Sequence, residues 1–199
     1  MMLRPDAVVA SVTEVTPDFL QARGVRAVMV DLDDTLLASG SDLLEPLFRA
    51  WLETLRGAEV PVVILSNGTH TRVAHWAREL GVVGLPLMGK PLARAFRQGL
   101  AELGTPAHET AMVGDQLFTD VLGANLAGMV SVLVTPLSPG KLLHTRALRR
   151  LERILLRRHR LTHRFAGLAR QFGFSASFCS VRLSAVGLSS VEVSWPSYR

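Results

Sequence analysis

Two short segments of the sequence gather carboxylates at spacings that could carry chemistry. The first is Asp31-Leu32-Asp33-Asp34-Thr35, and the second runs from Gly114-Asp115 to Asp120. Residues two apart in an extended chain project to one side, so Asp31 and Asp33 can face a common cleft. Paired carboxylates serve general acid–base chemistry and bind hard divalent cations. An EF-hand calcium loop is excluded, because Leu36 stands where that loop needs glycine.

Two further segments offer groups that bind anions. Ser66-Asn67-Gly68-Thr69 supplies a hydroxyl, an amide and backbone N–H groups beside a predicted helix start, and all of these can donate to phosphate oxygens. Gly89-Lys90-Pro91 supplies one ammonium group. Taken alone, the segment 66–69 is more typical of a helix-capping turn than of a phosphate site. Lys90 alone is more typical of a lysine in a solvated loop. Asp120 alone is equally typical of a helix N-cap.

Alternating sequence patterns must position these segments. Apolar runs typical of buried strands cover 27–32, 60–65, 85–88, 110–113 and 130–134, with helical patterns at 42–56, 71–80, 92–103 and 120–127. Continuous apolar strands separated by single helices predict a parallel sheet covered on both faces. The predicted fold class is α/β: a doubly wound, Rossmann-like sheet of about five strands. Ligands of such sheets bind at the carboxyl ends of the strands, where all four segments lie.

The order of acid pair, hydroxyl, lysine and second acid pair after successive strands resembles the haloacid dehalogenase superfamily of phosphotransferases. The residues that match its motifs are Asp31, Asp33, Thr35, Ser66, Lys90, Gly114, Asp115 and Asp120. The resemblance covers roughly residues 27–135. It implies a Rossmann-like phosphatase that hydrolyses phosphate monoesters.

The resemblance assigns roles to the four matching carboxylates. It implies that Asp31 is the nucleophile and becomes an aspartyl phosphate, and that Asp33 protonates the leaving oxygen and then activates water. It implies a Mg²⁺ cofactor held by Asp31, the backbone carbonyl of Asp33 and Asp115, with Asp120 as an additional anchor.

The resemblance also implies a phosphate-binding set. Ser66 and Lys90 would bind the transferring phosphoryl group, with Asn67 and Thr35 as supporting donors. One residue departs from the usual pattern, because close relatives often carry Asn at the position of Asp34. A third acid there adds repulsion beside the nucleophile unless its side chain turns away.

The motif spacings leave no room for an inserted cap domain. Thr35 and Ser66 are 31 positions apart, and Asn67 and Lys90 are 23 apart, distances that one helix and one strand fill. An uncapped cleft excludes water poorly around a small metabolite. It therefore suits a macromolecular substrate or a head group presented at a membrane, unless a second subunit supplies the cover; the oligomeric state is left open.

The composition predicts a compact globular chain. It has 199 residues, of which 48% are hydrophobic and 20% are charged. Its apolar runs are far shorter than the roughly 18 to 20 residues that cross a bilayer, and its N-terminus does not read as a secretory signal. We therefore expect a cytoplasmic protein. Its single cysteine, Cys179, excludes an internal disulfide and argues against a cysteine zinc site.

Charge is concentrated in one segment. Residues 1–140 hold 10 Lys or Arg and 15 Asp or Glu, whereas residues 141–164 hold nine basic residues and one acidic residue. Between Leu143 and Leu161, apolar residues recur at helical spacing and arginines fill the intervening positions. This pattern predicts a basic amphipathic helix that packs on the sheet or contacts an anionic membrane. Nucleic acid is an unexpected partner, because the segment lacks aromatic residues for base stacking.

The sequence therefore divides into four predicted parts: a lead-in segment (1–26), a phosphatase core (27–140), a basic helix (141–164) and a Ser-rich tail (165–199). The tail holds eight serines among its 35 residues. It matches no pattern we recognise, which leaves a disordered tail, an added pair of strands or an erroneous reading frame.

A narrower resemblance lies in Arg4-Pro5-Asp6, in the 114–125 loop and helix start, and in the Arg-rich run 149–153. These look like the YqeG-type branch of subfamily IIIA, which includes the mitochondrial and plastid phosphatidylglycerophosphate phosphatases. The likeness implies hydrolysis of phosphatidylglycerophosphate or another membrane-presented phosphate at the inner membrane face. The alternatives are a soluble sugar, nucleotide or protein phosphate as substrate, and a non-hydrolytic phospho-acceptor or binding module.

Overall fold

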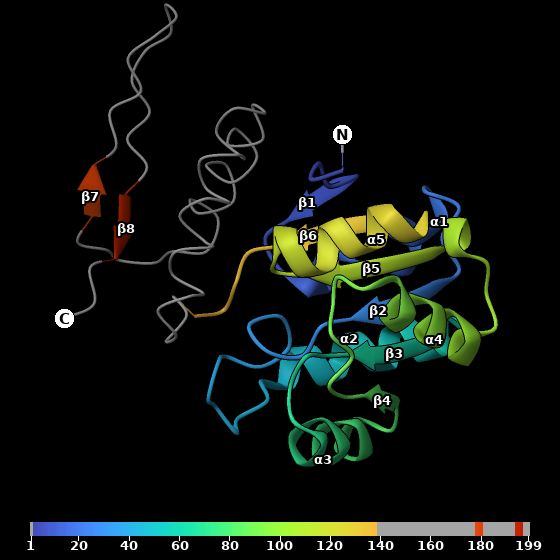
Figure 1. The fold of residues 1–199 in the computed structure, drawn as a ribbon. Coiled ribbons are helices and arrows are strands. Elements are labelled where there is room, and N and C mark those ends of the chain that lie inside the picture. The colour runs from blue at the N-terminus through green and yellow to red at the C-terminus, as the bar shows by residue number, and fades with distance from the viewer. Residues whose placement is uncertain (1, 139–177, 181–193, 197–199) are drawn as a thin grey trace, which may run out of the picture.

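A computed structural model describes residues 2–138, 178–180 and 194–196, and its centre is a parallel sheet (Figure 1). The six strands follow the order β1-β6-β5-β2-β3-β4. Their bounds are β1 (Ala7–Val9), β2 (Ala27–Val30), β3 (Val62–Leu65), β4 (Val83–Leu85), β5 (Thr110–Gly114) and β6 (Val130–Val134). The predicted doubly wound α/β class is confirmed. The sixth strand is β1, which comes from the predicted lead-in segment and pairs in parallel with β6.

Strand β2 occupies the middle of the sheet. It pairs with β5 on one side and with β3 on the other, both in parallel. All four of its side chains, Ala27 to Val30, are fully buried. A strand covered on both faces requires such a continuous apolar run. The residues that follow β2 therefore emerge at the centre of the carboxyl edge.

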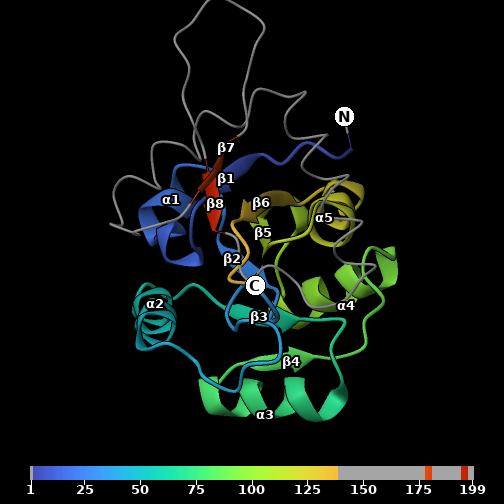
Figure 2. The ribbon, with the colours of Figure 1, turned by 90° about the vertical axis from the view of Figure 1, so that its left-hand side faces the viewer.

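Helices cover both faces of the sheet. They are α1 (Pro17–Gln21), α2 (Pro46–Gly57), α3 (His70–Leu80), α4 (Ala93–Leu103) and α5 (Leu122–Ala127). Figure 2 shows α1 and α2 on one side, α4 and α5 on the other, and α3 beside the edge strand β4. Helices α3, α4 and α5 end at glycines with positive φ, a backbone conformation that glycine adopts readily.

Two apolar clusters hold these layers together. On the first face, Trp51 and Leu55 of α2 belong to the cluster that contains Val28 and Val30. On the second face, Phe96 of α4 packs with the cluster that contains the alternate β2 residue Met29. Successive strand residues point to opposite faces, so β2 anchors both layers and is fixed relative to each.

Some element bounds differ from the sequence-based expectation. The helix predicted over 42–56 begins at Pro46, because residues 38–45 form a loop and proline suits the first helical turn. The strand predicted over 85–88 lies at Val83–Leu85. The helix predicted from Asp120 is preceded by a π-helical turn, η3 (Leu117–Val121).

No cap domain interrupts the motifs, as the spacings predicted. The chain between Thr35 and Ser66 holds α2 and β3, and the chain between Asn67 and Lys90 holds α3 and β4. Both stretches lie wholly inside the described residues. The carboxyl edge of the sheet is therefore bordered by loops alone in this part of the chain.

Beyond residue 138 the structure describes one antiparallel pair, β7 (Phe178–Ser180) with β8 (Ser194–Pro196). Both strands lie within the predicted Ser-rich tail, residues 165–199. The basic helix predicted over 143–161 lies outside the described residues. Among the residues that are described, no helix combines the length and apolar character needed to cross a membrane.

Candidate active site

Four successive strand ends bring the predicted site residues together. Asp31 follows β2, Ser66 follows β3, Lys90 lies in the loop after β4, and Asp115 follows β5. Because β2 lies between β5 and β3, their carboxyl ends meet at one place on the sheet edge. All four side chains are buried, with no residue more than 6% exposed. Buried polar groups of this kind require partners, and their partners define the site.

Lys90 is the centre of a buried ion-pair network. Its Nζ donates to Asp31 Oδ1 at 2.6 Å and to Asp120 Oδ1 at 2.7 Å. Burial by itself lowers the pKa of Lys90, but the adjacent carboxylates of Asp120 and Asp31 outweigh that effect and raise it above its usual range. Lys90 is therefore a permanent cation in the site rather than the solvated loop lysine that its sequence context alone suggests.

Burial makes the ionisation of Asp31 unfavourable. Desolvation by burial raises its pKa to about 7, although Lys90 opposes the shift; the negative charge of Asp120 adds to it. One ammonium faces three buried carboxylates here, so a proton on Asp31 relieves the excess negative charge when no metal is bound. A bound cation would replace that proton and leave Asp31 ionised.

Asp31, Asp115 and Asp120 form a candidate cation site. One carboxylate oxygen from each lies within 4.8 Å of the others. Three hard oxygen donors with excess negative charge fit Mg²⁺, which binds through few carboxylates and completes its sphere with water or phosphate oxygens. The three side chains predicted as metal ligands therefore converge.

The loop after β5 explains how Asp120 reaches the site. The π-helical turn η3 carries it, and π turns are frequent at functional sites. Its Oδ2 accepts a hydrogen bond from the backbone N–H of Gln116 at 3.1 Å. Gly114 lies directly beside its carboxyl group, so that a Cβ at position 114 would overlap it. The Gly-Asp motif therefore includes glycine because Asp120 occupies the space of a side chain.

Ser66 and Asn67 are also brought to this edge. The buried Ser66 Oγ accepts a hydrogen bond from the backbone N–H of Gly68 at 2.9 Å. The Asn67 amide binds the backbone of Lys90 twice, donating to its carbonyl at 3.2 Å and accepting from its N–H at 2.8 Å. Asn67, predicted as a phosphate donor, thus holds the backbone of Lys90 in place.

Asp33 and Arg72 form an ion pair that the sequence did not indicate. Arg72, in the first turns of α3, donates from Nε to Asp33 Oδ1 at 3.0 Å. The Asp33 side chain is 32% exposed, in contrast to the buried Asp31. Nothing in the sequence separates Arg72 from the other arginines, because its partner lies 39 residues away.

Thr35 and Asp34 differ in their surroundings. The Thr35 hydroxyl is buried and has no hydrogen-bond partner in the described part of the chain. Asp34 is buried with a φ of 62°, and its carboxylate accepts hydrogen bonds from the backbone and hydroxyl of Ser39 and from the Ser138 hydroxyl. Asp34 therefore fastens the loop after β2 to the segment after β6.

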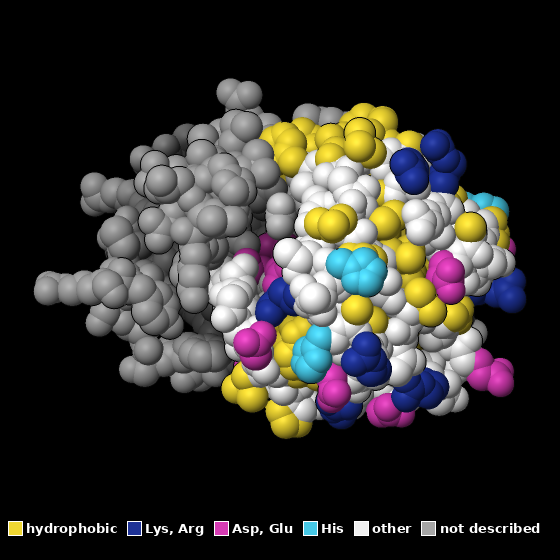
Figure 3. Space-filling model, turned by 60° about the horizontal axis from the view of Figure 1, so that its bottom comes forward, with side chains coloured by type: hydrophobic (Ala, Val, Ile, Leu, Met, Phe, Trp, Pro, Cys, Tyr) yellow, Lys and Arg dark blue, Asp and Glu magenta, His cyan; other side chains and the backbone are white. Residues whose placement is uncertain are grey.

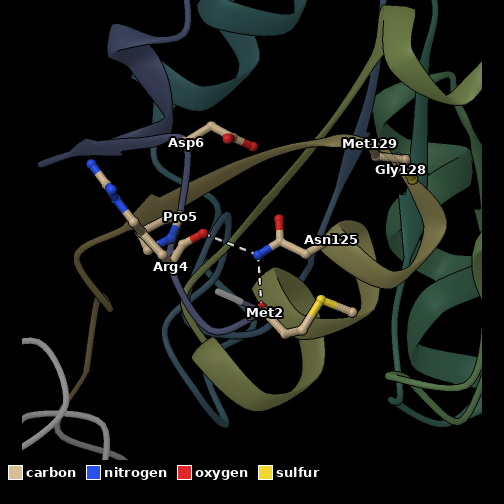
Figure 4. A pocket seen from close by; sticks show the side chains of 7 residues that line it. All are labelled: Met2, Arg4, Pro5, Asp6, Asn125, Gly128 and Met129. Atoms are coloured by element: carbon tan, nitrogen blue, oxygen red, sulfur yellow. Dashed lines mark hydrogen bonds between the residues drawn. The ribbon is translucent and has the colours of Figure 1, made fainter.

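A second hollow lies away from these acids, between the N-terminal segment and the α5–β6 corner (Figure 4). There Asn125 donates to the carbonyls of Met2 and Arg4, and Asp6 accepts from Ser131. Its polar groups thus serve to hold the N-terminal segment against β6. The carboxylate cluster is the stronger candidate for a reactive site.

The comparisons with known proteins agree with this geometry. A family model described as haloacid dehalogenase-like hydrolase matches residues 7–128. The chain is 32% identical to the probable phosphatase YqeG of Bacillus subtilis over 152 residues, which covers 76% of this chain and 88% of that protein. It is 30% identical to the chloroplastic and mitochondrial phosphatidylglycerophosphate phosphatase 1 of Arabidopsis thaliana over 71% of this chain, but over only 43% of that longer protein.

Among solved structures, one similar chain is 3-deoxy-D-manno-octulosonate 8-phosphate phosphatase from Moraxella catarrhalis, in complex with magnesium and phosphate ions. It shares 20% sequence identity and a TM-score of 0.43, over 66% of this chain and 78% of that one. A likeness of this size carries no conclusion about the chemistry of the site.

Proposed function

The chain belongs to the haloacid dehalogenase-like hydrolase family and is a phosphatase, and from that premise we propose that it is a Mg²⁺-dependent phosphomonoester hydrolase that works through an aspartyl phosphate. The observation that carries the proposal is the buried set of Asp31, Lys90, Asp115 and Asp120. In this proposal the set would supply the nucleophile, a phosphate-binding cation and the metal ligands within one small volume.

Two steps follow from this arrangement. In the first, an Asp31 oxygen attacks phosphorus, the bond to the leaving oxygen breaks, and Asp33 gives that oxygen a proton. In the second, Asp33 takes a proton from water, the water oxygen attacks phosphorus, and the bond to Asp31 breaks. Phosphate leaves, and both aspartates return to their starting states.

The remaining residues bind and orient the phosphoryl group. Lys90 and Ser66 contact its oxygens, and Asn67 holds the backbone of Lys90 so that the ammonium stays directed into the site. The carboxylates of Asp31, Asp115 and Asp120 and the backbone carbonyl of Asp33 would hold Mg²⁺, which when bound would supply positive charge to the phosphoryl oxygens and keep Asp31 ionised.

We propose a membrane-presented phosphate, phosphatidylglycerophosphate in the first instance, as the substrate. The similarity to a phosphatidylglycerophosphate phosphatase supports this choice, as does the absence of a cap between the motifs within the described residues. The basic segment 141–164 supplies nine positive charges that favour an anionic surface. The protein would then act peripherally at the inner membrane face.

The decisive experiment measures phosphate release from phosphatidylglycerophosphate in vesicles and from a panel of soluble sugar, nucleotide and protein phosphates, with Mg²⁺ and with a chelator. We expect the lipid to give the highest kcat/KM and the chelator to abolish turnover. Preference for a soluble phosphate would reject the lipid assignment. A stable phosphorylated protein without turnover would identify a phospho-acceptor module instead.

A further inference from the structure

We propose that Arg72 is a positioning residue for Asp33. Its guanidinium selects which oxygen of that carboxyl group faces the substrate. This inference rests on the proposed function, in which Asp33 transfers the proton in both steps. It concerns the arrangement around Asp33 and leaves the roles of Asp31 and Lys90 unchanged.

Arg72 is fixed at three nitrogens by three acceptors. Nε donates to Asp33 Oδ1 at 3.0 Å, one terminal nitrogen to Asp42 Oδ1 at 2.9 Å, and the other to the carbonyl of Ser41 at 2.8 Å. A guanidinium is planar and rigid, so two fixed nitrogens determine the direction of the third. The loop at residues 41–42 therefore orients the Nε–H that meets Asp33.

The ion pair lies in partly shielded surroundings. The side chains of Arg72 and Asp33 are 22% and 32% exposed, whereas that of Asp42 is 88% exposed. An ion pair loses strength with exposure to water and salt, so the Asp33 contact is better protected than the Asp42 contact. Arg72 therefore holds Asp33 more firmly than it holds Asp42.

The second oxygen of Asp33 faces a different space. A Cβ placed on Gly68 would lie 3.3 Å from Asp33 Oδ2 and 3.1 Å from Ser66 Oγ, so both atoms border the same small volume. Ser66 is a proposed phosphate-binding residue. Asp33 thus directs Oδ1 toward Arg72 and Oδ2 toward the side where the phosphoryl group would be held.

This division of the two oxygens is what proton transfer requires. An oxygen that accepts a hydrogen bond from a guanidinium is a poor site for a proton, because Arg stays charged and can only donate. The proton that Asp33 carries is therefore placed on Oδ2, next to the leaving oxygen and later next to water. Without Arg72, the carboxyl group can turn and present either oxygen.

The test replaces Arg72 with Gln, which removes the charge and the rigid fork, and with Lys, which keeps only the charge. Arg78→Gln is the matched control, since Arg78 is an exposed arginine on the same helix. Figure 3 shows the α3 side of the molecule, where Lys and Arg side chains are scattered among acidic, histidine and apolar ones. Loss of one such surface charge should have little effect.

The informative readout is a comparison of two leaving groups. An aryl phosphate with an acidic phenol needs no proton in the first step, whereas an alkyl phosphate does. With the alkyl ester, we expect Arg72→Gln to lose about 100-fold in kcat with little change in KM. With the aryl ester, KM should fall together with kcat, because slow dephosphorylation then limits turnover. With the aryl ester, rapid release of about one phenol per enzyme should precede slow turnover, and no such burst should appear with the alkyl ester. Arg72→Lys should recover part of kcat.

Two outcomes would overturn the inference. One is that Arg72→Gln has the same kcat as Arg78→Gln on both esters. The other is that Asp42→Asn, which removes the charge at the exposed contact and leaves the Ser41 and Asp33 contacts of Arg72 in place, lowers kcat as much as Arg72→Gln, because the loss would then follow from the charge of Asp42 and not from the pairing of Arg72 with Asp33. We expect Asp42→Asn to keep more than about half of kcat. If the unaltered protein turns over neither ester, the proposed function fails instead.

Discussion

Asp31 and Lys90 lie 59 residues apart in the sequence and form a buried ion pair, with 2.6 Å between Oδ1 and Nζ. The same ammonium also binds Asp120, so one cation is shared by two carboxylates. Buried charges are costly unless each finds a partner of opposite sign. The arrangement leaves negative charge in excess, which favours a proton or a cation at the site.

Replacement of Asp31 with Asn should separate catalysis from folding. The amide cannot attack phosphorus, so we expect phosphate release to fall by at least about 10³-fold. The amide also removes a carboxylate that is costly to ionise in this place, so the midpoint of thermal unfolding without metal should stay the same or rise. Phosphate release and thermal unfolding measure the two effects; retained turnover would refute the assigned nucleophile.

The pKa of Asp31 makes metal binding dependent on pH. Folding raises this pKa from 3.8 to about 7, so between these values the folded protein holds a proton that the unfolded chain has lost. This group's contribution to stability without metal therefore falls as pH rises through that window. Mg²⁺ must displace the proton, so its affinity should increase with pH until about pH 7 and then level off.

Calorimetric titration of Mg²⁺ at about pH 5.5 and about pH 8 measures this dependence, together with thermal unfolding at both pH values. Asp31→Asn is the control, because it has no proton to lose at this position. We expect the pH dependence of affinity to be much weaker in that variant. Equal Mg²⁺ affinity at both pH values in the unaltered protein would contradict the raised pKa.

Gly114→Ala should weaken metal binding through Asp120. The added methyl group would overlap the Asp120 carboxyl group, which must then move away from Lys90 and the cluster. We expect about a 10- to 100-fold loss of Mg²⁺ affinity, as for other residues that orient metal ligands. Gly57→Ala is the matched control: its new methyl group meets nothing within 4 Å, so its Mg²⁺ affinity should equal that of the unaltered protein.

Asn67→Ala tests whether Asn67 positions Lys90 or donates to phosphate. Loss of its two hydrogen bonds to the Lys90 backbone should destabilise the protein by about 1–3 kcal/mol, even without phosphate. Thr69→Ala should have little effect, because that exposed side chain makes no capping hydrogen bond. A variant with unchanged stability but weaker phosphate binding would instead assign Asn67 as a direct donor.

Neutralising the basic segment should weaken association with anionic vesicles. Each arginine near an anionic surface contributes up to about 1 kcal/mol, so a triple change of Arg149, Arg150 and Arg153 to Gln should lower binding by at least about tenfold. The matched control changes three exposed arginines on helices α3 and α4 instead, namely Arg78, Arg94 and Arg97. Vesicle co-sedimentation measures binding, and hydrolysis of a soluble aryl ester should stay constant. Equal binding by both triple variants would exclude a membrane role for this segment.

The local pattern of apolar residues in the sequence was sufficient to predict most strands of the sheet. Strands β2, β3, β5 and β6 are apolar runs buried on both faces, and a run of that kind is visible in the sequence itself. Strand β1 was missed because it spans only Ala7–Val9, and its place in the sheet depends on pairing with β6, more than 120 residues away. Sequence patterns do not report such distant pairings.

The candidate site, like the fold, was predicted only in part from the sequence. The convergence of Asp31, Lys90, Asp115 and Asp120 followed from placing each at a strand end, because parallel strands share one carboxyl edge. Strand order does not predict which side chains form hydrogen bonds with one another. Asn67 contacts the Lys90 backbone, and Arg72 reaches Asp33 from a helix that follows the next strand. These contacts depend on rotamers and on loop shape, which strand order does not determine.

The hydrogen bond from the Ser138 hydroxyl to the Asp34 carboxylate holds the segment after β6 beside the loop after β2. The backbone N–H of Leu137 also donates to the Asp34 carbonyl at 2.9 Å, so the chain passes beside the loop that follows Asp31, the proposed nucleophile. If the basic segment binds a membrane surface as proposed, a phosphate presented there would be held at a high effective concentration near Asp31, and the length of the connection after residue 138 would affect both binding and turnover.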